Sequence, residues 1–262
     1  MTLKKIFLGA NVSSVNENGE TPLHKACERG HLEIAKLLLH NKANMEQKTK
    51  KFGYTALHVS IRKGHSNLVD LLMSSGADIL ALSATGYSIL HLSILSVSKE
   101  MPKFILDYLD KKGDDSKLNQ LLHTADENGY TALHCACLFC QSDLACRLIN
   151  RGSNLRAESR EGETPLHKAC RSLIAQKQIV KRHKIVQHLI NKGAPTDVPD
   201  HSGSTPLHVA ASNGDEDSLC LVKCLVNNKA DVNAQNLKGE TPLHLAHKSD
   251  VIDFLLKNGA NN

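Results

Sequence analysis

A single pattern, Gly-x-Thr/Ser-x-Leu-His, recurs along the whole chain and limits what the chain can fold into. Seven copies are present, and they begin at Gly19, Gly53, Gly86, Gly129, Gly162, Gly203 and Gly239. Their spacings are 34, 33, 43, 33, 41 and 36 residues, which indicates a basic unit of about 33 residues with three insertions. Repeats of this length are supersecondary units that cannot bury their apolar faces alone. We therefore expect neighbouring units to stack into one continuous core.

Each unit continues in the same way after its Leu-His pair. The first copy reads TPLHKACERGHLEIAKLLLHNKANM, which predicts a short helix from Thr21 and Pro22, a turn at Gly30 and a second helix. Proline in the first helical turn loses no hydrogen bond, threonine caps free amides, and the preceding glycine permits a positive φ. The apolar residues of the second helix are Leu32, Ile34, Ala35, Leu37 and Leu38. The unit is therefore helix, turn, helix and extended loop.

This pattern resembles the ankyrin repeat, and the resemblance covers nearly the whole chain. It implies an all-α solenoid of stacked helix-turn-helix units with projecting hairpin loops, in which each repeated histidine ties its helix to the neighbouring loop. We predict one domain over residues 1–262, with a partial unit at 1–15 followed by units at about 16–48, 49–82, 83–125, 126–158, 159–199, 200–235 and 236–262.

The insertions and the chain ends depart from the repeat. We expect residues 110–128 to form a long projecting loop, and the extra residues within 171–184 to lengthen one or both helices of their unit. A third, shorter insertion brings the acidic stretch GDEDS at Gly214–Ser218. Both termini end abruptly, so we expect a monomeric module cut from a longer protein.

Composition favours a protein that stays inside the cell. No apolar run approaches the roughly 18 residues of a membrane span, and the apolar stretch near the start is too short for a secretory signal. The eight cysteines follow the repeat register, so we interpret them as reduced thiols in the cytoplasm or nucleus. A net charge of +5 permits an acidic partner but does not favour nucleic acid.

The stretch HCACLFCQSDLAC contains His134, Cys135, Cys137, Cys140 and Cys146 and suggests zinc. These residues fall on one short helix and the start of the next, where they cannot converge on a tetrahedron. We therefore interpret the cysteines as small apolar core residues and predict no metal.

Catalysis is equally disfavoured by the pattern. Histidines and cysteines recur with the period of the scaffold, and the sequence has no nucleophile elbow, phosphate-binding loop or His-Glu-x-x-His motif. We predict that the chain is not an enzyme and has no cofactor.

The position after each repeat glycine is the best candidate for binding. Three of the four tyrosines occupy it in consecutive units, which predicts an aromatic ladder on the concave face. Aromatic residues rimmed by charge mark recognition sites. The predicted partner-binding residues are Phe52, Tyr54, Tyr87, Tyr130, Leu138 and Phe139, with Lys50, Lys51, Arg62 and Lys63 at the rim. The alternative is that the tyrosines cover neighbouring loops.

A second candidate is a basic patch formed by Lys177, Lys181, Arg182 and Lys184. These cations either form a solvated helix face or meet an acidic partner, and strong salt dependence would favour the partner.

We therefore expect a scaffold, adaptor or inhibitor that binds an acidic protein segment with apolar anchors. One alternative is a small-ligand sensor, in which Lys51, Phe52 and Tyr54 hold a nucleotide or a methylated lysine. Another is an effector that an intracellular bacterium sends into its host. The stretch ADVNA at Ala230–Ala234 also resembles sites of asparagine hydroxylation in ankyrin repeats, at Asn233.

Overall fold

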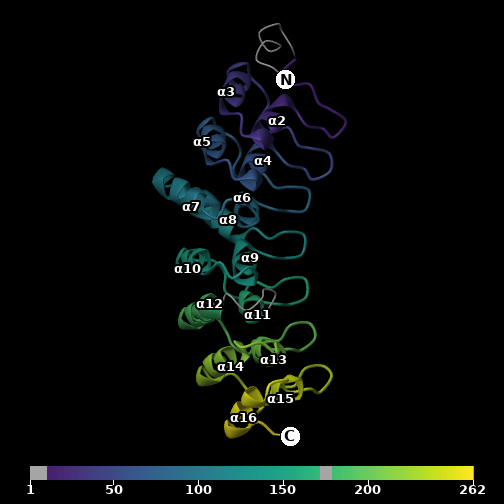
Figure 1. Cartoon of the computed structure of the whole chain (residues 1–262), viewed down its shortest axis with the longest axis vertical. Helices are drawn as coiled ribbons and strands as arrows, with labels where there is room; N and C mark the ends of the chain where they lie inside the picture. Colours follow the sequence, from purple (N-terminus) through teal and green to yellow (C-terminus); the bar gives the residue numbers. More distant parts are fainter. Residues whose placement is uncertain (1–10, 172–178, 262) are drawn as a thin grey trace. The chain divides into compact units, whose positions relative to one another are not determined.

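Short helices that begin with the repeated motif organise the structure, which is a computed structural model (Figure 1). It describes residues 11–171 and 179–261. In the first copy, the Thr21 side chain accepts a hydrogen bond from the backbone N–H of His24, and Pro22 occupies the first turn. The helix ends at Arg29, and Gly30, which caps it, has a left-handed φ of 76°. The predicted cap, turn and helix are therefore confirmed.

The chain divides into two compact units of several repeats each, residues 1–127 and 128–262. The helices of the first unit are α2 (Pro22–Arg29), α3 (Leu32–His40), α4 (Ala56–Lys63), α5 (Ser66–Ser74), α6 (Ile89–Ile94), α7 (Met101–Lys112) and α8 (Asp115–His123). Those of the second are α9 (Ala132–Leu138), α10 (Ser142–Asn150), α11 (Pro165–Cys170), α12 (Ile179–Asn191), α13 (Pro206–Ser212), α14 (Ser218–Asn227), α15 (Pro242–Leu245) and α16 (Ser249–Lys257). The described residues form no strand, so the predicted all-α class is confirmed.

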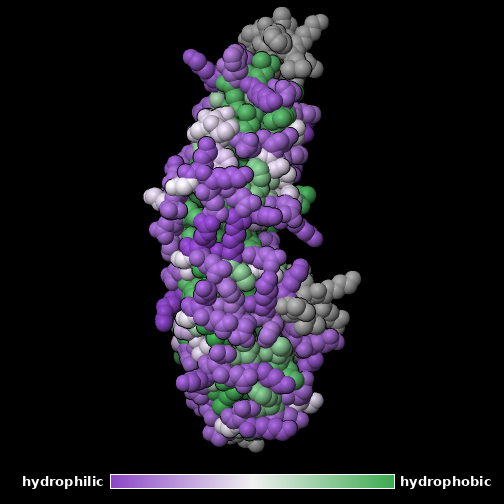
Figure 2. Space-filling view, turned by 90° about the vertical axis from the view of Figure 1, so that its left-hand side faces the viewer, coloured by the Kyte–Doolittle hydropathy of each residue, from purple (hydrophilic) through white to green (hydrophobic). Residues whose placement is uncertain are grey.

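Within each unit, the first helix of one repeat packs on its own second helix and on the first helix of the next repeat. In the first unit α2 contacts α3 and α4, and in the second unit α11 contacts α12 and α13. The motif leucines Leu23, Leu57, Leu133 and Leu166 are fully buried in these contacts. Figure 2 faces the second helices, and hydrophilic residues cover most of that surface. The core therefore lies between the helix layers of successive repeats.

The extended loops are joined by backbone hydrogen bonds from one repeat to the next. In the first unit, the Lys50 N–H donates to the Asn18 carbonyl at 2.9 Å, and the Ala84 N–H donates to the Phe52 carbonyl at 2.9 Å. A Cβ on Gly53 would lie 2.6 Å from the Ala84 nitrogen, so this close approach requires glycine.

The insertion at 110–128 is not the projecting loop that we expected. Residues 115–123 form α8, whose Leu118, Leu121 and Leu122 are buried. Their i, i+3, i+4 spacing places them on one helix face, and the Asp114 side chain accepts from the Lys117 N–H at 3.2 Å to cap the helix. The extra residues therefore add to the core of the first unit.

The insertion within 171–184 lengthens the second helix of its repeat, as expected. Helix α12 has 13 residues, whereas α3, α5 and α10 have nine each. Residues 172–178 lie outside the described part of the chain. The first helix, α11, ends at Cys170 and is not lengthened.

Candidate protein-binding surface

A groove on the first unit brings together half of the ten predicted partner-binding residues. Its volume is about 390 Å³. It is lined by Asn18, Glu20, His24, Glu28, Thr49, Lys51, Phe52, Tyr54, Val59, Arg62 and Lys63. The loop before α4 supplies Lys51, Phe52 and Tyr54, while α4 itself supplies Arg62 and Lys63.

Two rings and two cations form a column in this groove. Phe52 and Tyr54 stack with their ring centroids 5.3 Å apart and their planes 20° from parallel. The Lys51 ammonium lies 5.1 Å from the centre of the Phe52 ring, and the Arg62 guanidinium lies 5.8 Å from that of Tyr54. Phe52 remains 43% exposed. The stack therefore presents an apolar surface between positive charges.

The carboxylates of the groove are already paired with lysines. Lys25 Nζ lies 2.8 Å from Glu20 and 2.9 Å from Glu28, and Lys63 Nζ lies 3.5 Å from Glu28. The hydrogen bond from Lys25 lowers the pKa of both Glu20 and Glu28. Among the described residues, no carboxylate forms an ion pair with Arg62. The open charge of the groove is therefore positive.

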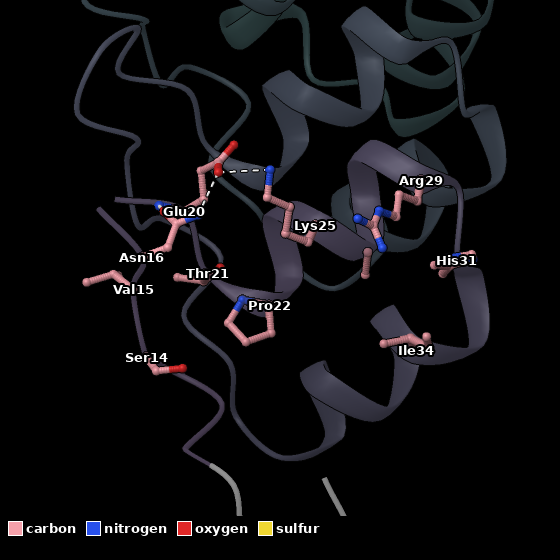
Figure 3. A pocket seen from close by; sticks show the side chains of 11 residues that line it. Ser14, Val15, Asn16, Glu20, Thr21, Pro22, Lys25, Arg29, His31 and Ile34 are labelled. Atoms are coloured by element: carbon pink, nitrogen blue, oxygen red, sulfur yellow. Dashed lines mark hydrogen bonds and ion pairs between the residues drawn. The ribbon is translucent and has the colours of Figure 1, made fainter. Parts of the chain in front are cut away.

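A second hollow of about 300 Å³ lies on the first repeat (Figure 3). There the Glu20 carboxylate is held between Lys25 and the Asn16 side-chain amide, whose nitrogen donates to it at 2.8 Å. Pro22 and Ile34 also line this hollow. Because Glu20 is held on both sides, the first repeat offers no free carboxylate there to a basic partner.

The other predicted residues of the first unit lie outside the groove lining. Tyr87 is half-buried and stacks on His91, with centroids 5.9 Å apart and planes 24° from parallel. Lys50 is exposed, and its backbone N–H belongs to the loop hydrogen bonds described above.

In the second unit, Tyr130 covers an internal ion pair. Its hydroxyl accepts from Lys168 Nζ at 2.8 Å, and the same nitrogen lies 4.4 Å from the centre of its ring. Lys168 also pairs with Glu163, which pairs in turn with Arg171. Burial alone would raise the pKa of Glu163, but its hydrogen bond with Lys168 and the two cations lower it. Tyr130 therefore contacts the next repeat, as in the alternative that the tyrosines cover neighbouring loops, but the residue that it covers, Lys168, lies on helix α11.

Sequence reasoning did not identify Glu163 and Lys168 as an interacting pair. The same two residue types also occur at these positions in the first copy of the motif, so the sequence does not distinguish a buried pair from an exposed one.

The other two predicted residues of the second unit lie at the end of α9, where Leu138 is half-buried and Phe139 is 37% exposed.

The predicted basic patch loses one of its members. Arg182 is only 5% exposed, and both of its terminal nitrogens lie 3.0 Å from an Asp215 carboxylate oxygen, with Asp217 at 3.2 Å. A cation in this position cannot meet a partner. The pair joins the long α12 to the acidic turn of the next repeat, a partnership that the sequence pattern did not reveal.

The remaining members of the patch differ in their surroundings. Lys184 is exposed and pairs with Asp143 at 2.8 Å, and Lys181 is exposed. Lys177 lies outside the described residues.

Comparison with known proteins decides the family. The family model "Ankyrin repeats (3 copies)" matches residues 2–83, 47–115, 111–182 and 173–262. The chain belongs to the ankyrin repeat family. It is 36% identical over 61 residues to the ankyrin repeat-containing protein P1E11.10 of Schizosaccharomyces pombe, and 26% identical over 95 residues to diacylglycerol kinase zeta of Rattus norvegicus. These matches cover 23% and 36% of the chain, but only 29% and 9% of the two relatives.

Solved ankyrin repeat domains have the same fold. The human ASB11 domain aligns with a TM-score of 0.70 and 23% identity, over 93% of this chain and all of that one. The Bcl-3 domain, from the IkappaB protein family, aligns with a TM-score of 0.70 and 28% identity, over 92% and 100% of the two chains. The ankyrin solenoid predicted from the motif is therefore confirmed.

The cysteines of these ankyrin repeats are core residues or small surface residues. All eight are free, and Cys27, Cys137 and Cys170 are fully buried at equivalent positions. Burial raises the pKa of Cys27 to about 11 and also raises the pKa of Cys137 and Cys170. Within the described residues, no group of three or more His, Cys, Asp or Glu side chains could hold a metal. Cys140 takes the place of a turn glycine and has a φ of 53°.

Asn233 is at the position that resembles a hydroxylation site, and its side chain joins the last two ankyrin loops. Its amide nitrogen donates to the Gly259 carbonyl at 2.9 Å, and its amide oxygen accepts from the Asn261 N–H at 2.8 Å.

None of the helices that the structure describes has the length and apolar character needed to cross a bilayer.

Proposed function

We propose that the chain is a protein-interaction module that holds a segment of a partner protein in the groove of the first unit. The observation that carries this proposal is the Phe52–Tyr54 stack, in which Phe52 is exposed and Tyr54 half-buried, with Arg62 beside it. Stacked rings supply a large contact area and lose little rotamer entropy on binding. Arg62 supplies a charge that no carboxylate of the described chain neutralises. A segment with an apolar anchor and an acidic flank matches both features.

The ring geometry favours a protein segment over a small ligand. A methylated lysine is held in a cage of aromatic faces that stand apart to admit it, and a nucleotide base needs a free ring face, whereas Lys51 and Arg62 already lie over the Phe52 and Tyr54 rings. Phe52 and Tyr54 already stack on each other at 5.3 Å, within the roughly 4.5–7 Å of a direct ring pair. A thermal-shift assay with ATP and with a trimethyl-lysine peptide should therefore show no stabilisation.

The test uses random phage-displayed peptides of about twelve residues, since an extended residue spans about 3.3 Å and such a peptide can cross several repeats. We expect the wild-type chain to enrich peptides that the Phe52→Ala/Tyr54→Ala variant does not bind. Binding should weaken when salt is raised to about 0.5 M, because the open charge is exposed to solvent.

Tyr108→Ala provides the matched control, because Tyr108 lies on α7 of the same unit beside Lys112. The control should retain the selected peptides. If selection yields no peptide that depends on Phe52 and Tyr54, the groove is not a protein-binding site.

A further inference from the structure

One register position changes its chemistry from repeat to repeat across the first unit. The residue nine places after the motif glycine lies at the end of each first helix, and it is Glu28, then Arg62, then Leu95. The first of these is paired with lysines, the second lies over the Tyr54 ring, and the third is an apolar side chain left 41% exposed. From one repeat to the next, this position therefore changes from a paired carboxylate to a cation without an ion pair among the described residues, and then to an exposed apolar side chain.

A second apolar side chain extends this surface at the same turn. Val97 is 81% exposed, and its backbone N–H donates to the Arg62 carbonyl at 3.2 Å. The Ser96 hydroxyl donates to the Ile61 carbonyl at 2.7 Å, so the turn that follows α6 is fixed against the end of α4. Leu95 and Val97 are thus held next to the groove, although they do not line it.

We propose that the partner segment continues beyond the groove along the repeats, with an acidic residue on Arg62 and an apolar residue on Leu95 and Val97. This inference rests on the proposed function of the groove. Charge complementarity selects an acidic residue, because Arg62 is exposed and the nearby lysines Lys25 and Lys63 are the ones paired with carboxylates.

The spacing between repeats defines the motif of the segment. Packed helices lie about 8–10 Å apart, and an extended residue spans about 3.3 Å. The acidic and apolar residues should therefore be separated by about three positions in an extended segment. A further apolar residue of the segment should lie on Phe52, which the Tyr54 ring joins to Arg62.

The experiment takes the peptides selected on the wild-type chain and measures their affinities for Leu95→Ser/Val97→Ser and for Val97→Ser alone. Circular dichroism checks that each variant is folded. The matched control is Leu237→Ser in the second unit, because Leu237 is 80% exposed and Val97 is 81% exposed. We expect at least a tenfold loss for the double variant, a smaller loss for Val97→Ser and no loss for the control.

Charge exchange tests the acidic residue separately. Arg62→Glu should weaken the selected peptides at least tenfold, and changing the peptide's acidic residue to lysine should restore their affinity for that variant. Peptides that need Phe52 and Tyr54 but bind the Leu95→Ser/Val97→Ser variant as tightly as wild type would overturn this inference and leave the proposed function intact. A failure to recover any peptide that depends on Phe52 and Tyr54 would overturn both.

Discussion

The nonamer GETPLHKAC occurs once in each unit, at residues 19–27 and 162–170, and the two copies share a scaffold but differ in electrostatic surroundings. His24 Nε2 lies 2.9 Å from the Tyr54 carbonyl, and His167 Nε2 lies 3.0 Å from the Ser204 carbonyl. The lysines differ, since the side chain of Lys25 is 41% exposed and that of Lys168 is 5% exposed.

The preceding repeat of the same unit causes this difference. Tyr130 lies over Lys168 and accepts a hydrogen bond from it, so the lysine and Glu163 are removed from water together. In the first copy, the Glu20 and Lys25 pair remains in contact with solvent. Identical residues therefore form a surface pair in one unit and a buried pair in the other. The motif determines the helix, whereas the neighbouring repeat determines the surroundings of its charges.

The largest expected effect concerns the scaffold histidines, for which the two units should behave alike. Each Nδ1 lies next to a backbone N–H and accepts from it, and each Nε2 lies next to a carbonyl and donates to it, so the rings are neutral. Burial lowers the pKa of His58 in the first unit and of His134 in the second from 6.5 to about 4.

A lowered pKa means that the unfolded chain binds more protons between pH 6.5 and 4, so stability is complete above pH 6.5 and is lost as the pH falls towards 4. The loss should be on the order of 3 kcal/mol for each imidazole, and therefore about 6 kcal/mol for the two together. Urea unfolding followed by circular dichroism across this range measures it. His58→Gln should start less stable and then lose less on acidification. An equal loss in the variant would contradict the assignment.

The next largest effect distinguishes the two copies of the nonamer by the stability that each lysine contributes. Lys168→Met leaves the Glu163 carboxylate buried with Arg171 as its remaining partner, and removing one member of a buried pair costs about 3–5 kcal/mol. Lys25→Met removes a partly exposed pair and should cost less than about 1 kcal/mol. Urea unfolding of both variants at neutral pH gives the difference. Equal losses would show that the two nonamers have the same surroundings.

A smaller effect measures what the Tyr130 hydroxyl contributes to stability. Tyr130→Phe keeps the ring above Lys168 but removes the hydroxyl that accepts from it, and a hydrogen bond to a charged group contributes about 1.5 kcal/mol. Tyr54→Phe is the control, because Tyr54 is placed by ring contacts with Phe52 and His58. If both variants lose the same stability, the hydroxyl of Tyr130 does not distinguish the copies.

The features that the sequence revealed are those that every repeat shares. Glycine, threonine and histidine recur together because they make local contacts over three or four residues, as Thr21 and His24 do. Local contacts depend on spacing along the chain, and spacing is visible in the sequence. The groove residues Phe52 and Tyr54 were predicted for the same reason, since they flank one repeat glycine.

The features that were missed depend on contacts between repeats. Arg182 pairs with Asp215, which is 33 residues away and in a different insertion, so neither insertion alone indicates the pair. The repeat pattern has no third helix and therefore predicts a loop where α8 lies, although Leu118, Leu121 and Leu122 have helical spacing. Residues that leave the repeat register must be read for their own periodicity.

The smallest effect compares the turn between the two helices of one repeat in each unit. In the first unit the turn after α4 has Gly64 with a φ of 79°, and in the second unit the turn after α9 has Cys140 with a φ of 53°. A left-handed backbone costs a residue with a Cβ about 1–2 kcal/mol, whereas glycine adopts it freely. Cys140→Gly should therefore be more stable than Cys140→Ala by about 1 kcal/mol in urea unfolding. Both variants lose the buried thiol, so the comparison isolates the backbone, and an advantage for alanine would mean that the turn relaxes away from the left-handed region.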